Sequence, residues 1–258
     1  MIGETSLLCE SYIMAQTYSL VLKVSRYDPD SKKSWVQEYS VQAGEVLRLV
    51  DVLRDINEKQ DPTLAWPSSC EHGMCGSCAM RVNGKPVLAC ELLVGDAVDY
   101  FKTHTFTIKP LTIAPVLRDL VVDLEKAYER IRIVKPYIIH ASPLHPEGDE
   151  YRIPPGILKV YESATRCINC FCCAQACISR HTRFLGPNAM LTELVRLMDH
   201  REMAKDERID VLFGDKGISR CHTSRACSHV CPKEIDVAHF LALAKESKII
   251  LVKRNIPE

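Results

Sequence analysis

Net charge, a leader sequence and long hydrophobic runs are all missing from this sequence. The 33 basic residues balance 33 acidic ones, which removes the electrostatic signature of a nucleic-acid-binding protein. The first sixteen residues contain no basic region, no continuous apolar run and no arginine, so we expect neither a signal peptide nor a transit peptide. No segment supplies the roughly 20 apolar residues that a membrane-spanning helix needs. Low-complexity segments are absent too.

Cysteine is the residue that the sequence has in excess. The chain has 13 cysteines among 258 residues, and 47% of the residues are hydrophobic. A disulfide scaffold is normally a small secreted domain, whereas this chain is long enough for one large domain or two ordinary ones. We therefore expect reduced thiols that bind metal. The cysteines form three groups, at 70–90, 167–177 and 221–231, and Cys9 stands alone.

The first hundred residues predict a small curled sheet that holds one helix. Apolar and polar residues alternate over 18–25 and again over 35–41, on either side of an Asp-Pro-Asp turn at 28–30, which indicates two strands. Apolar residues at helical spacing over 46–56 predict a helix. An Asn-Gly pair at 83–84 between two apolar runs indicates a hairpin.

Beyond residue 112 the pattern becomes helical. Apolar residues follow the 3.6-residue period over 116–131, and again over 191–198 behind a Gly-Pro pair. A last helix is expected behind Asp236, which is suited to cap it. The proline-rich stretch 140–156 is interpreted as a surface linker. We expect an N-terminal extension at 1–16, one domain at 17–112 and a second domain at 113–258.

The first cysteine group has the spacing of plant-type [2Fe–2S] ferredoxins. A loop that folds thiolates around two irons brings its backbone close to the cluster, and Gly73 and Gly76 supply the small positions that this approach needs. A structural zinc site is the alternative, but zinc ribbons usually show two Cys-x2-Cys pairs and only one pair here is so spaced. His72 is interpreted as a residue that tunes the cluster or is solvated. The expected ligands are Cys70, Cys75, Cys78 and Cys90.

Two runs with bacterial ferredoxin spacing follow, and the second is incomplete. CINCFCCAQAC supplies Cys167, Cys170, Cys173 and Cys177, whereas CHTSRACSHVCP supplies Cys221, Cys227 and Cys231 with Ser224 at the second position. In two-cluster ferredoxins the fourth cysteine of each run ligates the other run's cluster. This rule assigns Cys167, Cys170, Cys173 and Cys231 to a [4Fe–4S] cluster, and Cys177, Cys221 and Cys227 to the remaining site.

Three thiolates suit a [3Fe–4S] cluster, because that cluster lacks the iron that a fourth ligand would bind. Two alternatives stay open for Ser224: it could be an ordinary turn residue, or its hydroxyl could hold a fourth iron as a harder ligand. Cys172 and Cys9 are left over, and buried packing is the default role of a free cysteine. Cys172 could also exchange with Cys173, although the spacing favours Cys173. Ile178 stands where the ferredoxin run has proline.

This constellation resembles the iron–sulfur subunit of succinate dehydrogenase and quinol:fumarate reductase, over the whole chain from about residue 17. The segments RDLVVD, KPYII and CINC lean toward the fumarate reductase branch. Further motifs that resemble the family are RDLVVDLEKAYERIRIVKPYII, FLGPNAM and CPKEID.

The resemblance implies an α+β chain, with a β-grasp [2Fe–2S] domain followed by an α-helical ferredoxin domain. It implies one subunit of a complex, in which a flavoprotein partner holds covalent FAD and the dicarboxylate site, and a membrane anchor holds quinone and often haem. Electrons would pass between flavin and quinone through the three clusters, and this chain would have no catalytic acid, base or nucleophile. Because the chain has no spanning helix, we expect a peripheral protein at the cytoplasmic face of a prokaryotic inner membrane.

Two polar residues match positions near the family's quinone site. His222 follows the first cysteine of the second run, and Lys245 lies on the last expected helix; a solvated helix face is the alternative for Lys245. Succinate dehydrogenases typically carry a tryptophan soon after the residue matching Cys177, and this chain reads ISRHTRF there. This departure favours a fumarate reductase or an atypical anchor. A soluble thiol- or heterodisulfide-linked fumarate reductase and an iron–sulfur redox sensor are the alternative functions.

Overall fold

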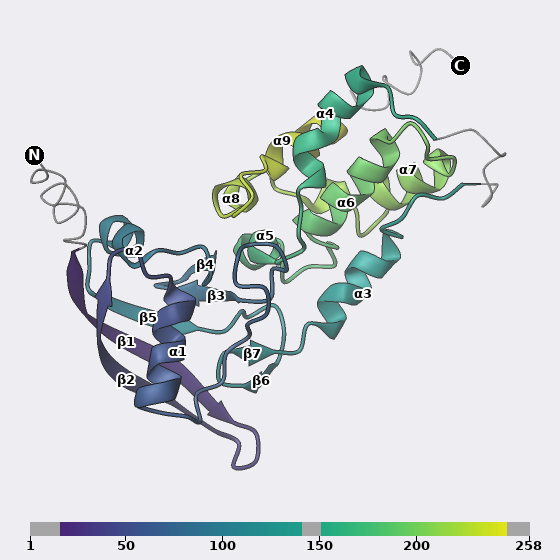
Figure 1. Ribbon diagram of the computed structural model, residues 1–258. Helices are drawn as coiled ribbons and strands as arrows, with labels where there is room; N and C mark the ends of the chain where they lie inside the picture. Colours follow the sequence, from purple (N-terminus) through teal and green to yellow (C-terminus); the bar gives the residue numbers. More distant parts are fainter. Residues whose placement is uncertain (1–15, 141–150, 247–258) are drawn as a thin grey trace, which may run out of the picture.

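The computed structural model describes residues 16–140 and 151–246. Its N-terminal part is a five-stranded mixed sheet with two helices, and its C-terminal part is mainly helical (Figure 1). The chain is therefore α+β, as predicted. Cys9, almost all of the expected extension and the centre of the expected linker lie outside the described residues. Within the described ranges, no helix is both long enough and apolar enough to cross a bilayer.

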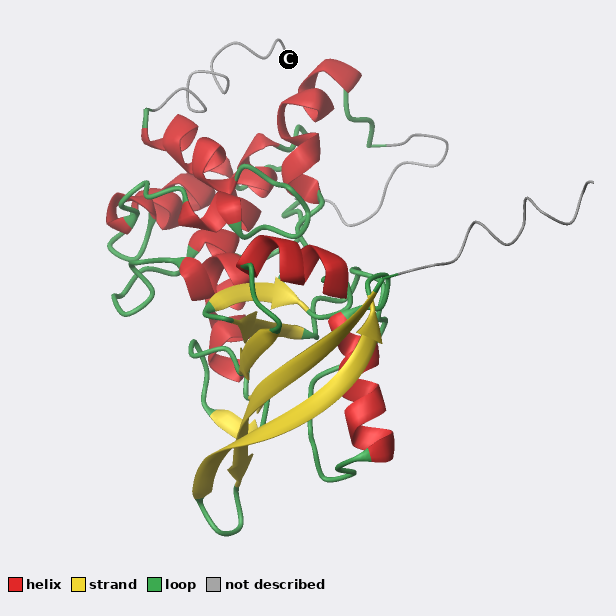
Figure 2. Cartoon of the chain, turned by 90° about the vertical axis from the view of Figure 1, so that its left-hand side faces the viewer, coloured by secondary structure: helices red, strands yellow, loops and turns green. Residues whose placement is uncertain are grey.

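The sheet is built around the predicted N-terminal hairpin. The alternation in β1 buries Tyr18, Leu20, Leu22 and Val24, so one face of the strand packs on the core. β1 pairs with β2 antiparallel and with β5 parallel, and the strand order is β2-β1-β5-β3-β4. The strands are β1 (Thr17–Asp28), β2 (Lys33–Gly44), β3 (Ala79–Val82), β4 (Lys85–Leu88) and β5 (Thr105–Lys109). Figure 2 shows the long β1–β2 hairpin extending away from the helical part.

Helix α1 (Leu49–Lys59) packs on the sheet through one apolar stripe, which includes Val50, Leu53 and Ile56 (Figure 2). Val46, at the start of the predicted helical pattern, lies outside the helix and is exposed. Helix α2 (Val94–Phe101) follows the first cysteine group. The predicted Asn-Gly turn joins β3 to β4, and both of its residues have positive φ (46° and 86°), as a type I′ hairpin turn requires.

The predicted helix over 116–131 is wrong in its first half. Residues Val116–Arg118 (β6) and Val121–Val122 (β7) form a two-stranded ribbon, and helix α3 spans only Glu125–Ile133. The turn of the ribbon is Asp119, which has a φ of 47°. Its carboxylate accepts hydrogen bonds from the backbone N–H groups of Tyr27 (2.9 Å) and Ala65 (2.8 Å) and pairs with the buried Arg26 guanidinium at 2.9 Å. These distant partners outweigh the local helical pattern.

Helix α6 lies at the centre of the helical part and contacts α3, α4, α5, α7 and α9. The helices predicted behind the Gly-Pro pair and behind Asp236 are confirmed, and the Asp236 carboxylate caps α9 by accepting from the backbone N–H of His239 at 3.1 Å. Helix α4 begins inside the expected linker, with Pro155 in its first turn. The helices are α4 (Pro155–Thr165), α5 (Cys172–Ala176), α6 (Pro187–Met198), α7 (Lys205–Phe213), α8 (Ala226–His229) and α9 (Val237–Lys245), with a short 3₁₀ turn, η2 (Ile218–Arg220).

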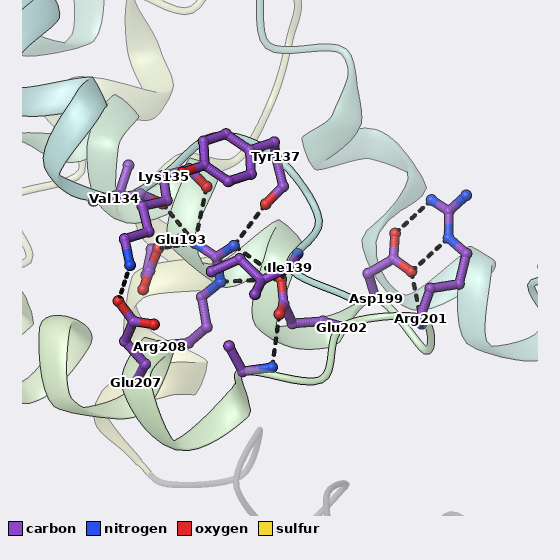
Figure 3. A network of polar contacts seen from close by, with 11 residues as sticks. Val134, Lys135, Tyr137, Ile139, Glu193, Asp199, Arg201, Glu202, Glu207 and Arg208 are labelled. Carbon is purple, nitrogen blue, oxygen red and sulfur yellow. Dashed lines mark hydrogen bonds and ion pairs between the residues drawn. The ribbon is translucent and has the colours of Figure 1, made fainter. Parts of the chain in front are cut away.

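A buried arginine fastens the segment after α3 to the helical part (Figure 3). The Arg208 guanidinium pairs with Glu193 at 3.0 Å and Glu202 at 2.8 Å, and all three side chains are at most 2% exposed. It also donates hydrogen bonds to the carbonyls of Val134 (2.6 Å) and Tyr137 (2.7 Å). Burial raises the pKa of the Glu193 carboxyl to about 7, although Arg208 acts against this rise. The backbone carbonyl of Lys135 also accepts a hydrogen bond from Arg208. One side chain therefore satisfies two buried carboxyls and three backbone carbonyls.

Substitution Arg208→Met should destabilise the chain strongly, because both carboxyls would then be buried without a cation. Breaking a buried pair in this way costs about 3–5 kcal/mol, and we expect a correspondingly lower midpoint in urea unfolding of the cluster-loaded chain. Lys23→Met breaks the exposed Lys23–Glu38 pair of 2.8 Å and serves as the control, with an expected loss below about 1 kcal/mol. Equal midpoints for the two variants would contradict the role assigned to Arg208.

Candidate iron–sulfur sites

The first cysteine loop directs backbone N–H groups at its own sulfurs. Gly73 donates to the Cys90 sulfur at 3.2 Å, and Met74 and Cys75 donate to the Cys70 sulfur at 3.4 and 3.3 Å. Such donors stabilise negative charge on sulfur, and the thiolate is the form that binds metal. The loop therefore has the donor set that a [2Fe–2S] cluster needs.

The four thiols of this loop have different surroundings. The backbone N–H of His72, with the neighbouring Cys75 thiol and further N–H groups, lowers the pKa of Cys70 to about 7, whereas burial raises the pKa of Cys78 to about 12. Cys78 and Cys90 are buried and Cys75 is exposed. The loop thus reaches from the core of the sheet domain to its surface, and an electron carrier held there would lie near solvent or a partner on one side.

The two ferredoxin-type runs have the same backbone shape. Asn169 and Phe171 have φ values of 51° and 62°, and the residues at the same places in the second run, Thr223 and Arg225, have 54° and 60°. A short helix follows in each case, α5 in the first run and α8 in the second. Ser224 therefore occupies the place that Cys170 takes in the first run, and it is exposed.

The structure brings cysteines of the two runs close to one another in two places. Four of them line one cavity: Cys167, Cys170, Cys173 and Cys231. Burial raises the pKa of the Cys173 thiol, and its neighbours in this set raise it further, as does Cys227 of the second run. In the second set, burial raises the pKa of Cys227 to about 11, with contributions from Cys221 and Cys177. Cys177 and Cys231 thus each lie with cysteines of the other run.

The leftover cysteine of the first run, Cys172, is fully buried in the first turn of α5. Among the residues that the structure describes, Cys173 lines the four-cysteine cavity and Cys172 does not. The Cys170 thiol raises the pKa of Cys172, and so does burial. This placement favours a packing role for Cys172.

Lys245 of α9 lies against the start of the second run. Its ammonium group donates hydrogen bonds to the carbonyl of Cys221 and to the hydroxyl of Thr223, the latter at 3.1 Å. His222, between these two residues, is exposed. The structure therefore places the two polar residues that the sequence suggested for a quinone neighbourhood in one region, beside the three-cysteine set.

The first and second cysteine groups touch through Gly76. This residue has a φ of 73°, and a Cβ added to it would lie 2.9 Å from both Cα and Cβ of Cys170 and 3.1 Å from the carbonyl oxygen of Ile168. The close approach therefore requires glycine at this position. In Figure 1, α5 lies beside β4 in this region.

An ion pair that the sequence did not reveal crosses the same junction. The Glu91 carboxylate, next to Cys90, lies 3.4 Å from the ammonium group of Lys233, which follows Cys231 and a proline. Glu91 also packs on Gly73, where an added Cβ would lie only 1.8 Å from Oε1. One carboxylate thus connects the first loop to the end of the second run. Its position next to a cysteine in the sequence was the signal that could have identified it.

Substitution Gly76→Ala should disturb the junction more than Gly84→Ala. Both glycines have positive φ, but an added Cβ at Gly84 meets nothing within 4 Å. Each alanine costs about 1–2 kcal/mol for its left-handed conformation, and only Gly76→Ala adds the clash with Cys170. We expect a lower unfolding midpoint and less iron per chain for Gly76→Ala. Equal values for the two variants would contradict a required close contact.

Glu91→Gln and Lys233→Met should shift reduction potentials in opposite directions. Loss of a negative charge beside the clusters favours the reduced form, and loss of the positive charge disfavours it. In redox titrations followed by electron paramagnetic resonance, we expect shifts of severalfold in the oxidised-to-reduced ratio, where tenfold corresponds to about 59 mV for one electron. Lys23→Met and Glu38→Gln, in an exposed pair on the far hairpin, are the controls. Shifts of the same sign would indicate a packing effect instead.

Two family models match successive parts of the chain. Residues 21–129 match the family described as "2Fe-2S iron-sulfur cluster binding domain", and residues 163–235 match "4Fe-4S dicluster domain". The first match includes the β6–β7 ribbon and the start of α3. The chain therefore consists of a [2Fe–2S] domain followed by a dicluster domain.

Curated relatives cover nearly the whole chain. The fumarate reductase iron-sulfur subunit of Haemophilus influenzae is 34% identical over 245 residues, which are 90% of this chain and 94% of that protein. The mitochondrial succinate dehydrogenase (ubiquinone) iron-sulfur subunit 1 of Oryza sativa subsp. japonica is 32% identical over 232 residues, or 88% and 81%.

A solved structure is similar over the same length. A chain of the Mycobacterium smegmatis Sdh1 complex in the apo form superposes with a TM-score of 0.77 at 26% identity, covering 93% of this chain and 99% of that one. Sequence and fold thus agree over both domains, and the chain belongs to the family of iron–sulfur subunits of fumarate reductase and succinate dehydrogenase.

Proposed function

We propose that this chain relays electrons between FAD in a flavoprotein subunit and a quinone, such as menaquinone, in a membrane anchor. The observation that carries this proposal is the succession of the three cysteine groups. The first group contacts the second through Gly76 and Cys170. The second and third groups each contribute one cysteine to the other's set, Cys177 and Cys231 respectively. A continuous series of sites is suited to conduction, whereas a sensor needs only one.

The residues of this chain hold the clusters and set their potentials, and the bound clusters would supply one-electron transfer. Cys70, Cys75, Cys78 and Cys90 are assigned to [2Fe–2S]; Cys167, Cys170, Cys173 and Cys231 to [4Fe–4S]; and Cys177, Cys221 and Cys227 to [3Fe–4S]. Backbone N–H groups directed at sulfur stabilise the reduced state, and burial of thiols such as Cys173 keeps water away.

The architecture supports the finer fold assignment as well. A mixed sheet that folds around α1, with the cysteine loop between α1 and β3, fits a β-grasp ferredoxin domain. Two cysteine runs that each lead into a short helix fit an α-helical ferredoxin domain. We place the boundary near residue 112, where Thr112 accepts a hydrogen bond from the buried Gln175 amide at 2.9 Å and donates one to it through its backbone N–H at 2.6 Å.

The three-cysteine set is proposed as the end that meets the quinone. His222 and Lys245 lie beside it, and both can offer hydrogen bonds to a quinone oxygen. Attachment to the membrane would then be peripheral, through the anchor subunit and on the cytoplasmic face. FAD, quinone and any haem would be held by the partner subunits.

Electron paramagnetic resonance of anaerobically prepared protein, before and after reduction, tests the proposal. A [3Fe–4S] signal in the oxidised sample, replaced on reduction by [2Fe–2S] and [4Fe–4S] signals, is the expected result. Two four-iron signals without a three-iron signal would mean that another group holds a fourth iron, and would overturn the proposed quinone end.

Ser224→Cys should convert the three-iron signal into a second four-iron signal, because the backbone at this position repeats that of Cys170. Ser228→Cys, one turn later on α8, is the control and should keep the three-iron signal. Since the Ser228 hydroxyl donates a hydrogen bond to the Asp236 carboxylate and accepts one from the backbone N–H of Ala238, this control is read from the signal type and not from stability. An unchanged three-iron signal in Ser224→Cys would contradict the proposal that the fourth iron is missing because this position is a serine.

A further inference from the structure

A cavity of about 130 Å³ lies where α3, α5 and α6 meet. A water molecule occupies about 30 Å³ in the liquid, so the cavity has room for a ligand of several heavy atoms. Its lining comes from distant segments, with residues from α3, from the end of α5 and from the start of α6. It is distinct from the four-cysteine cavity, with which it shares Phe171 and Asn188. Cys177, from the three-cysteine set, contributes to its wall.

The lining is basic. Lys126 and Arg130 come from α3, and Arg180 and His181 follow α5; no aspartate or glutamate is among the described lining residues. Within the described ranges, none of these four side chains makes an ion pair. Other cations close by in the sequence are paired, as Arg132 is with Glu125 at 2.6 Å and Arg183 with Asp215 at 2.8 Å. The cavity therefore has positive charge that the chain leaves uncompensated.

Two observations show that positive groups lie close together here and that one of their donors lacks an acceptor. Burial lowers the pKa of the Arg81 guanidinium, and the positive charge of the nearby Arg180 lowers it further. Among residues 16–140 and 151–246, the buried Nε atom of Arg180 has no hydrogen-bond partner, whereas its Nη1 donates to the carbonyl of Gln175 at 3.2 Å. A buried donor without an acceptor is costly, and an anion in the cavity would reduce both this cost and the repulsion between the arginines.

The start of α6 adds to the positive potential. Gly186, Pro187 and Asn188 line the cavity, and they are the cap and first residues of a 12-residue helix. The first N–H groups of a helix have no intrahelical acceptor, and the helix dipole places partial positive charge there. Helix terminus, guanidinium groups and cavity thus favour the same kind of ligand.

We propose that this cavity is a binding site for a small oxyanion, either inorganic phosphate or a free carboxylate. Guanidinium groups match the oxygens of both anions in pairs of hydrogen bonds. An anion there would lie beside Cys177, and negative charge close to a cluster disfavours its reduction. Binding itself does not depend on the proposed function; the effect on the three-iron centre does.

Isothermal titration of the anaerobic, cluster-loaded full chain with inorganic phosphate, and separately with succinate, at constant ionic strength tests the site. We expect saturable binding of at least one anion, weakened about tenfold by Arg130→Gln and severalfold by Lys126→Gln. Arg132→Gln removes the same charge from the same helix but lies outside the cavity lining, and it should bind as the unmodified chain does. The tighter of the two anions identifies the source of the oxyanion.

Three results would overturn the proposal. The first is no saturable binding of either anion, and the second is equal weakening by Arg130→Gln and Arg132→Gln, which would indicate diffuse attraction. The third is binding by the full chain but not by the assembled complex, because a partner's side chain would then fill the cavity. If binding is found, redox titration of the three-iron signal with and without the anion tests the effect on that centre. An unchanged reduction potential would contradict the proposed position of the three-iron centre and leave the anion site standing.

Discussion

Thiols from two separate runs must meet at two sites, and this requirement organises the helical half of the molecule. Cys231 lies with the first run and Cys177 lies with the second, so neither set is complete without a residue from a distant segment. The left-handed residues before α5 and α8 turn the backbone so that successive cysteines face the same point. Helices α5 and α8, which follow the two runs, contact each other, so the chain from α6 to η2 must return to the same place.

The parts that the sequence predicted correctly depend on local rules. The Asn-Gly turn, the alternation in β1 and the Asp236 cap are each decided by a few neighbouring residues. The failures have long-range causes. Val116 and Leu120 follow a helical period, but Asp119 is held by Tyr27 and Ala65. Likewise Glu91–Lys233 joins residues that no periodicity connects.

A net charge of zero conceals two opposite electrostatic arrangements. Around Arg208 the cation and its carboxyls are buried together, and every strong charge has a partner. At the junction of α3, α5 and α6, cations line the cavity and none of the described lining residues is a carboxylate. The first arrangement stabilises the segment after α3, whereas the second raises the free energy of the folded chain. Composition alone could not separate them, because both depend on which helices meet.

The contact between Gly76 and Cys170 has a consequence for rate. Electron tunnelling falls off exponentially with the distance between centres, and in the proposed relay that distance would be set by the close approach at Gly76 instead of by flexible side chains. Thermal motion of surface residues would then change the coupling very little. If the proposed relay operates, the two domains would adjust to partner subunits elsewhere, while the gap between the first two centres would stay constant.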